Sequence, residues 1–192
     1  RGRDVGAGAT TEITIPAGGR YTFKPQVTVR TPALWSIESP NMYKAVATVR
    51  MNAGRSAIDT YETPFGIRTV TFDADKGFFL NGKSVKIKGM CNHQDHAGVG
   101  SGLPDRLQYF RIEKLKEMGV NAYRTSHNPP TPELLDACDR LGMLVLDETR
   151  MMSSSEEGLS QLARLVRRDR NHPSVFCWSI GNEEPAQATE VG

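Results

Sequence analysis

The sequence has no apolar run that approaches the ~18 to 20 residues needed to cross a bilayer, and it has no low-complexity tract. It also lacks an excess of charge of one sign, because 24 Lys and Arg against 22 Asp and Glu give a net charge of only +2. Basic and acidic residues are interspersed, as in "RIEKLKEMG", which is typical of a solvated helix face. The composition therefore argues against binding to membranes or nucleic acids and indicates an ordinary globular protein.

Cysteine is scarce as well. The three cysteines, Cys91, Cys138 and Cys177, lie far apart and each has apolar neighbours. An odd number of widely spaced cysteines argues against a disulfide scaffold, so we expect buried free thiols.

Helix-period segments are missing from residues 1 to about 70. The stretches "EITIPAG", "YTFKPQVTV" and "YKAVATVRM" instead alternate apolar and polar residues between Gly, Pro and Asn, and "IESPNMY" reads as a loop. Short strands with turn signals about every ten residues are typical of a β-sandwich. We therefore expect residues 1–68 to be the C-terminal part of an immunoglobulin-like β-sandwich domain.

The pattern changes from about Phe72. A turn at Asn81-Gly82 precedes an alternating strand through Val85 and Ile87. Downstream, helix-period and strand-like segments alternate, with helices expected at 105–118, 132–141 and 155–168 and strands at 120–126, 143–148 and 174–181. This order predicts an α/β fold in which four parallel strands are joined by helical crossovers.

The expected helices carry terminal signals and inner faces. Thr131, Pro132 and Gly142 fit the N-cap, first turn and C′ position of one helix, and Ser154 and Glu157 have capping-box spacing for the next. The expected inward positions are Leu107, Phe110 or Ile112, Leu115 and Met118 in the first helix, Leu134, Leu135, Cys138 and Leu141 in the second, and Leu159, Leu162 and Val166 in the third.

Polar groups follow each of the four expected strands. The segments are "CNHQDHAG", "RTSHNPP", "DETR" and "GNEEP". Because chemistry gathers at the C-terminal ends of parallel strands, four polar ends in register predict a functional site there.

Glu183 is the candidate proton donor, because a carboxyl group in a partly desolvated pocket can keep its proton near neutral pH. The amide of Asn182 can donate to a substrate hydroxyl. The alternative is a purely structural role, in which Glu183 caps a helix or pairs with an arginine. Glu184 is expected to be structural, because adjacent residues leaving a strand point apart. Arg124 is expected either to pair with Asp147 or Glu148 or to act at the site, and the two roles are compatible.

The "HQDH" segment invites a metal interpretation through His93, Asp95 and His96, with His127 or Glu183 as a third anchor. Its spacing matches no strong ligand signature, and hydrogen bonding to a polyol substrate fits these residues more simply. Trp178 is expected to belong to the core rather than to a sugar platform. His172 is expected to be structural, at the start of its strand.

These residues resemble glycoside hydrolase family 2, the β-galactosidase and β-glucuronidase family. The resemblance lies in "NAYRTSHNPPTPELLDACDRLGMLVL", in "DRNHPSVFCWSIGNEE" and in "FGIRTVTFDADKGFFLNGKSVKIKG". One departure is Asn128, where the family usually has Tyr. The resemblance implies that residues 69–192 are the first half of a TIM (β/α)8 barrel that follows the β-sandwich domain.

The resemblance also implies a retaining exo-β-glycosidase that acts on terminal β-D-galactosides of a β-linked oligosaccharide or glycoside. Glu183 would be its general acid/base and Asn182 the partner of the sugar 2-hydroxyl. Further substrate contacts would come from His127, Arg124, Asn92, Asp95 and His96. The residues of "NHQDHAGVG" and "DETRMMSSS" favour β-galactosidase-type members. The full-length enzyme could form an oligomer.

Two family features have no match here. No residue matches the motif of the family's nucleophilic glutamate, which lies on the seventh barrel strand, so we expect this chain to be an inactive piece of a longer enzyme. Some relatives have a Glu and a His as magnesium ligands just after the third strand. Near those positions this chain has Met152 and Ser154. We therefore expect no metal, and no cofactor is implied. The alternatives are a β-glucuronidase, a β-mannosidase or a non-catalytic carbohydrate-binding half-barrel, and the compartment stays open.

Overall fold

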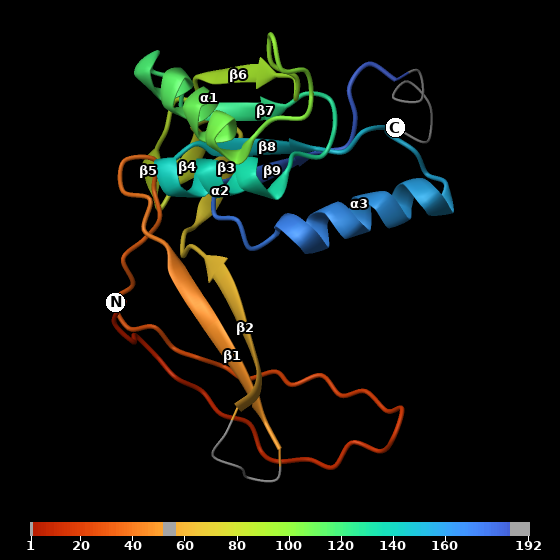
Figure 1. The fold of residues 1–192 in the computed structure, drawn as a ribbon. Helices are drawn as coiled ribbons and strands as arrows, with labels where there is room; N and C mark the ends of the chain where they lie inside the picture. Colours follow the sequence, from red (N-terminus) through yellow and green to blue (C-terminus); the bar gives the residue numbers. More distant parts are fainter. Residues whose placement is uncertain (1, 52–56, 185–192) are drawn as a thin grey trace. The chain divides into compact units, whose positions relative to one another are not determined.

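The computed structural model describes residues 2–51 and 57–184. The chain divides into two compact units. The first unit comprises residues 1–33 and 45–63, and the second comprises 34–44 and 64–192. Figure 1 shows the order of the elements along the chain. None of the helices in the described part is long and apolar enough to cross a membrane.

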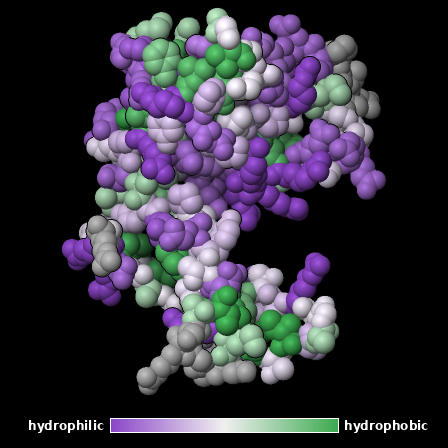
Figure 2. All heavy atoms as spheres, viewed as in Figure 1, coloured by the Kyte–Doolittle hydropathy of each residue, from purple (hydrophilic) through white to green (hydrophobic). Residues whose placement is uncertain are grey.

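The first unit contains most of two paired strands, β1 (Tyr43–Arg50) and β2 (Ala57–Phe65). β1 was predicted from its alternating pattern. Its outward-facing side chains include apolar ones, and Figure 2 shows green residues at the surface of this unit. The exposed apolar residues of these two strands are Val46, Val49, Ile58 and Tyr61.

The predicted strands at "EITIPAG" and "YTFKPQVTV" are wrong for the described residues. Both segments are drawn as extended chain without strand structure in Figure 1. Alternation predicts which side chains share a face, but a strand also needs a neighbour that accepts and donates along its backbone. Pro16 and Pro25 each remove a backbone donor from these stretches, which weakens any such ladder.

The second unit begins with a small antiparallel sheet of β3 (Val70–Asp73), β4 (Gly77–Leu80) and β5 (Lys83–Ser84). The predicted turn at Asn81-Gly82 is confirmed, with φ of 53° and 75°. The predicted strand through Val85 and Ile87 is wrong, because both residues lie between strands. Their side chains pack instead against the core cluster that contains Trp35 and Phe78.

A four-stranded parallel sheet follows, in the order β6 (Gly89–Asn92), β7 (Ala122–Thr125), β8 (Leu144–Glu148) and β9 (Val175–Ser179). The connections between consecutive strands carry α1 (Asp105–Glu117), α2 (Pro132–Leu141) and α3 (Glu156–Asp169). Every strand therefore ends at the same edge of the sheet. The predicted order of elements is confirmed, with the first strand at Gly89–Asn92 instead of at Val85 and Ile87.

Helix α2 matches its prediction at both ends. Thr131 is the N-cap, Pro132 opens the helix, and Gly142 ends it with φ of 72°. The inner faces of the other two helices match the prediction only in part. In α1 Ile112 is the buried one of the two predicted alternatives and Leu115 packs against the same core, whereas Phe110, and Met118 just after the helix, are exposed.

Helix α3 is capped by Ser155, not Ser154. The Ser155 hydroxyl accepts a hydrogen bond from the Gly158 N–H at 3.1 Å. Within the helix, Leu165 is 5% exposed and Leu159 is 56% exposed, so the inner stripe differs from the predicted one.

Two apolar clusters hold the second unit together. One joins α1 and α2 to the strands through Ile112, Leu135, Cys138, Tyr123 and Val145, with Trp178 packed against it as predicted. The other brings Trp35, Phe78 and Leu80 together with Ala122 and Leu144, which lie at the starts of β7 and β8. Because the small sheet covers these starts, the opposite ends of the strands are the ones left to form a site.

Candidate active site

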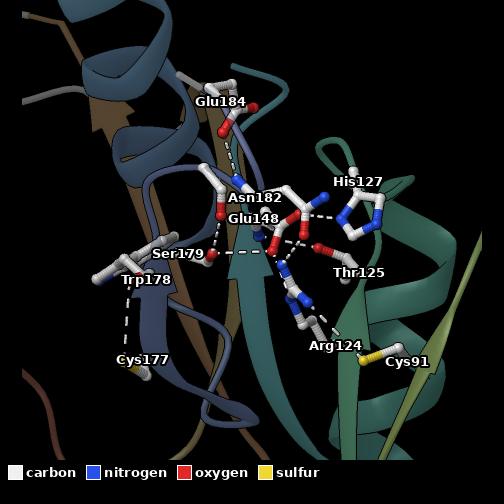
Figure 3. A network of polar contacts seen from close by, with 11 residues as sticks. Cys91, Arg124, Thr125, His127, Glu148, Cys177, Trp178, Ser179, Asn182 and Glu184 are labelled. Carbon is white, nitrogen blue, oxygen red and sulfur yellow. Dashed lines mark hydrogen bonds and ion pairs between the residues drawn. The ribbon is translucent and has the colours of Figure 1, made fainter. Parts of the chain in front are cut away.

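The ends of β7, β8 and β9 bring a polar network together. The strand register aligns Arg124 of β7 with Leu146 of β8, and Glu148 of β8 with Ser179 of β9. Side chains two apart in a strand share a face. Arg124, Glu148 and Ser179 therefore point to the same side of the sheet, where Figure 3 shows them.

Glu148 is the centre of this network, and its side chain is 0% exposed. One carboxylate oxygen, Oε2, lies 2.6 Å from Arg124 Nε and 2.8 Å from the Ser179 hydroxyl. The other oxygen, Oε1, lies 2.6 Å from His127 Nδ1. The backbone N–H of Glu148 donates to the Thr125 hydroxyl at 2.9 Å. A buried charge is costly unless it is paired and hydrogen-bonded, and here both oxygens have partners.

Arg124 extends the network to the end of β9. Its Nη2 donates to Asn182 Oδ1 at 2.9 Å, so the amide oxygen of Asn182 faces the guanidinium. The donating end of that amide is therefore directed away from Arg124. Burial alone would lower the pKa of Arg124, but the hydrogen bond and charge of Glu148 outweigh it and raise the pKa.

Cys91 touches the same arginine, with Arg124 Nη1 4.0 Å from its sulfur. All three cysteines are free thiols, as predicted. The prediction that all are buried is wrong for Cys91, which is exposed, and Cys177 is only half-buried. Cys91 lies in the outer strand of the described sheet, β6, which has a strand neighbour on one side only.

The two glutamates after Asn182 differ in their contacts. Glu184 Oε2 accepts a hydrogen bond from the Asn182 backbone N–H at 2.6 Å, which lowers the pKa of Glu184 and supports the structural role expected for it. Glu183 is exposed, and among the described residues no hydrogen bond or ion pair to its side chain is found. Its assignment as general acid/base stays a prediction.

The predicted substrate residues at the end of β6 and in the loop after it are not part of this network. Asn92 is half-buried, and its backbone oxygen accepts from the Tyr123 hydroxyl at 3.4 Å. Asp95 is exposed, and His96 forms a local turn with Gly100 through backbone hydrogen bonds. In this segment it is His93 that approaches the site, with its ring 5.1 Å from the His127 ring, edge to face.

The structure adds three residues that sequence reasoning did not place in the site: Glu148, Ser179 and Thr125. Glu148 was considered only as part of the strand-end segment "DETR" and as a possible partner of Arg124. The signal was its position, because a carboxylate at the end of an otherwise apolar run needs a buried partner. Ser179 and Thr125 gave no such signal, since small hydroxyl residues are common in strands.

A separate cluster lies away from this network. Asp136 and Asp139 of α2 and His172, before β9, have ligand-type atoms within 4.8 Å of one another. Asp139 already contacts His172 Nδ1 at 2.7 Å and accepts from the Ser174 N–H at 3.1 Å. These contacts fit the structural role expected for His172. The described residues show no comparable metal-binding cluster around "HQDH".

Comparison with protein families agrees with the resemblance. The TIM barrel domain of glycosyl hydrolases family 2 matches residues 73–157 and 154–190, and a second model, described as glycosyl hydrolases family 2, matches residues 2–68. The chain thus contains an immunoglobulin-like domain of that family and part of a TIM barrel, which confirms the expected fold class.

Individual relatives lead to the same family. The chain is 45% identical over 179 residues to the beta-galactosidase BoGH2A of Bacteroides ovatus, covering 87% of this chain and 21% of that protein. It is 40% identical over 170 residues to a putative beta-glucuronidase of Formosa agariphila, covering 82% and 16%. The chain therefore spans about a fifth of the length of these relatives.

A solved structure of a family member from Bacteroides cellulosilyticus superposes with a TM-score of 0.78 at 42% identity, covering 87% of this chain and 25% of that one. The barrel model alone matches more than half of the sequence. The chain belongs to glycosyl hydrolases family 2.

Proposed function

We propose that this chain contributes to a retaining exo-β-glycosidase that hydrolyses terminal β-D-galactosides. The observation that carries the proposal is the Arg124–Asn182 hydrogen bond at the C-terminal ends of the strands. It fixes the amide orientation immediately before Glu183, at the edge of a parallel sheet where chemistry is expected. Family membership and the beta-galactosidase relative support the reaction class.

In this proposal Glu183 protonates the leaving oxygen while a second carboxylate attacks the anomeric carbon, and Glu183 then activates a water to release the sugar. The donating end of the Asn182 amide binds the sugar 2-hydroxyl. His127 and Arg124 line the same subsite. Asn92, Asp95 and His96 are proposed as outer contacts of the glycoside.

The proposal needs a nucleophile that these 192 residues do not supply, because none of them matches the family's nucleophile motif. Retaining enzymes hold the two carboxyl groups about 5 to 5.5 Å apart. We therefore propose that the nucleophile belongs to barrel strands outside residues 1–192, and that the isolated chain has no turnover.

A β-glucuronidase is the second candidate, because the 40% identical relative carries that name. The two candidates differ at the sugar C6, where one substrate has a hydroxymethyl group and the other a carboxylate. Assays of the full-length gene product with nitrophenyl β-galactoside and β-glucuronide separate them, and nitrophenyl β-mannoside covers the remaining alternative.

The test of Glu183 compares Glu183→Gln with Glu157→Gln in the full-length gene product. Glu157 is an exposed glutamate of α3 that lies outside the site network. Removal of a general acid costs about 10² to 10⁴-fold in kcat/KM. We expect that loss in Glu183→Gln, smaller for a dinitrophenyl glycoside because its leaving group needs no proton, and no change in Glu157→Gln.

Azide gives a second reading of the same variant. On a dinitrophenyl glycoside, whose leaving group needs no proton, the glycosyl-enzyme intermediate still forms; with no general base to activate water it accumulates, and added azide can attack it without base assistance. We expect azide to speed turnover of Glu183→Gln and to yield the β-glycosyl azide. If Glu183→Gln hydrolyses every substrate as fast as the parent, the assignment of Glu183 is wrong.

A further inference from the structure

We propose that Glu148 is a positioning residue that sets the ring orientation and the protonated nitrogen of His127 in the sugar subsite. The inference rests on the proposed function, since it concerns how this chain presents His127 to a glycoside. Glu148 itself is fully buried and touches no substrate in this proposal. It acts through the side chains that contact it.

The two oxygens of the Glu148 carboxylate have different partners. Oε2 accepts from two donors, Arg124 Nε at 2.6 Å and the Ser179 hydroxyl at 2.8 Å. Oε1 faces His127 Nδ1 at 2.6 Å. A carboxylate paired with a guanidinium only accepts hydrogen bonds, so the proton of this third contact belongs to the imidazole.

His127 therefore carries a proton on Nδ1. Its other ring nitrogen, Nε2, lies on the far side of the ring from Glu148 (Figure 3). The His127 side chain is 27% exposed, so the ring reaches the surface while its anchor is buried. In the neutral ring, Nε2 is then an acceptor, suited to a sugar hydroxyl that donates.

The network resists rearrangement because it is braced from three strands. The Ser179 hydroxyl from β9 and Arg124 from β7 hold one oxygen, and the Glu148 backbone N–H is held by Thr125. The Ser179 hydroxyl is engaged within the protein, because its oxygen lies 3.1 Å from the Gly181 carbonyl and 2.8 Å from Glu148. The carboxylate is thus fixed before any substrate binds.

Glu148→Gln tests the role with little change in shape. The glutamine oxygen can still accept from Arg124 and Ser179, but its NH2 then faces His127 Nδ1. That nitrogen must now accept, so the ring proton moves to Nε2 and the face toward the sugar becomes a donor. We expect kcat/KM to fall on the order of 10²-fold, because two hydrogen-bond donors, the His127 Nε2–H and the sugar hydroxyl, would then face each other.

A double-mutant cycle separates positioning from a general structural effect. The four proteins are the parent, Glu148→Gln, His127→Ala and the double variant, all in the full-length gene product and assayed on the best nitrophenyl glycoside. If Glu148 acts through His127, Glu148→Gln should cost less than about 3-fold once His127 is already alanine, which gives a coupling of about 10-fold or more.

Asp147→Asn is the matched control. Asp147 is the preceding residue in β8, is also fully buried, and faces the opposite side of the sheet, beside Asp169. We expect it to keep parent kcat/KM and to show no coupling to His127→Ala. Ser179→Ala is a milder second variant. We expect it to lower kcat/KM about 3 to 10-fold, with coupling to His127→Ala of the same sign. It tests the proposal even if Glu148→Gln does not fold.

The outcomes are distinct. Independent, multiplying effects of Glu148→Gln and His127→Ala overturn the positioning role, as does parent activity in Glu148→Gln. If Glu148→Gln does not fold, an uncoupled Ser179→Ala overturns it. In these cases loss of activity in Glu183→Gln shows that the proposed function still stands. If no glycoside is cleaved by the parent, the proposed function fails, and this inference fails with it.

Discussion

Two adjacent acidic residues of β8, Asp147 and Glu148, are both fully buried, and their surroundings differ completely. Sequence reasoning left open which of them pairs with Arg124. The answer depends on strand register, because Arg124 is aligned with Leu146 and only Glu148 shares that face. Register between parallel strands is set by packing across the whole sheet, so it cannot be read from the local pattern of a single sequence.

Arg124, His127 and Asn182 were predicted for the site from their places at strand ends, and the structure brings them to one network. Their proximity follows because parallel strands end at a common edge whatever their register, and their role in a site stays a prediction. Asn92, Asp95 and His96 lie outside the network, because the loop after β6 follows its own turn around Gly100. Strand ends are predictable from sequence, whereas loop conformations are not.

Asp147 lacks the partners that Glu148 has. Both of its carboxylate oxygens are buried without a hydrogen bond among the described residues. Burial, together with the charge of neighbouring Asp169, raises the pKa of Asp147 from its ordinary value of 3.8 to about 8. The Asp169 carboxylate contacts Arg168, at 2.6 Å between Nε and Oδ1.

This pKa predicts how stability depends on pH. Between about pH 4 and 8 the folded protein holds a proton on Asp147 that the unfolded chain releases, so the free energy of unfolding falls as pH rises through that window. Asp147→Asn should remove this slope and stabilise the protein at pH 7 by about 1 to 3 kcal/mol. Urea unfolding of parent and variant at pH 5 and pH 8 measures it.

The expected increase in the free energy of unfolding of Asp147→Asn over the parent is largest at high pH. At pH 5 the parent and Asp147→Asn should differ much less than at pH 8, because pH 5 lies only about one unit above the ordinary pKa of 3.8 and proton release by the unfolded chain then favours unfolding only slightly. An equal difference at both pH values, or a less stable variant at pH 8, would contradict the prediction.

At the scale of elements, prediction worked best where local signals agree. Helix α2 has Pro132 at its start, Gly142 at its end and a continuous apolar face between them, and its predicted bounds match the structure. Helix α3 begins in "SSSEE", where three serines in a row offer equivalent caps. The choice among them depends on backbone geometry, and Ser155 adopts the extended conformation of an N-cap, with ψ of 155°.

The α3 cap gives a paired prediction. Ser155→Ala removes the acceptor of the Gly158 N–H and should lower the free energy of unfolding by about 1 kcal/mol. Ser154→Ala is the control, since Ser154 is the neighbour that capping-box spacing favoured, and it should change stability by less than about 0.5 kcal/mol. Chemical denaturation of both variants gives the comparison, and equal effects would show that the cap is not at Ser155.

At the scale of the whole molecule, the second unit uses residues that the sequence placed elsewhere. Residues 34–44 and 64–68 precede the predicted boundary at 68/69, yet they belong to the same compact unit as the parallel sheet. Arg68 Nε donates to the Pro173 carbonyl at 2.6 Å, just before β9. Such long-range contacts have no periodic signature, so composition and patterning could not assign these residues, and the boundary itself stays a prediction.

Trp35 is the anchor of this arrangement. It is 0% exposed and lies in the cluster that covers the starts of β7 and β8. Its indole N–H donates to the Asp139 carbonyl of α2 at 2.8 Å, and its own carbonyl accepts from the Asn81 amide at 2.9 Å. One residue thus connects an N-terminal loop, the small sheet and a barrel helix.

Trp35→Ala should therefore weaken the second unit as a whole. Loss of a fully buried Trp costs about 3 to 5 kcal/mol, and the Asp139 carbonyl also loses its donor. Tyr61→Phe in β2 is the control, because that exposed ring is in the first unit and should shift stability by less than about 0.5 kcal/mol. Denaturation of the full-length gene product, followed by hydrogen exchange of β7 and β8, measures the effect. If exchange in these strands is unchanged in Trp35→Ala, their starts are held by the small sheet alone, and the tryptophan is not the anchor.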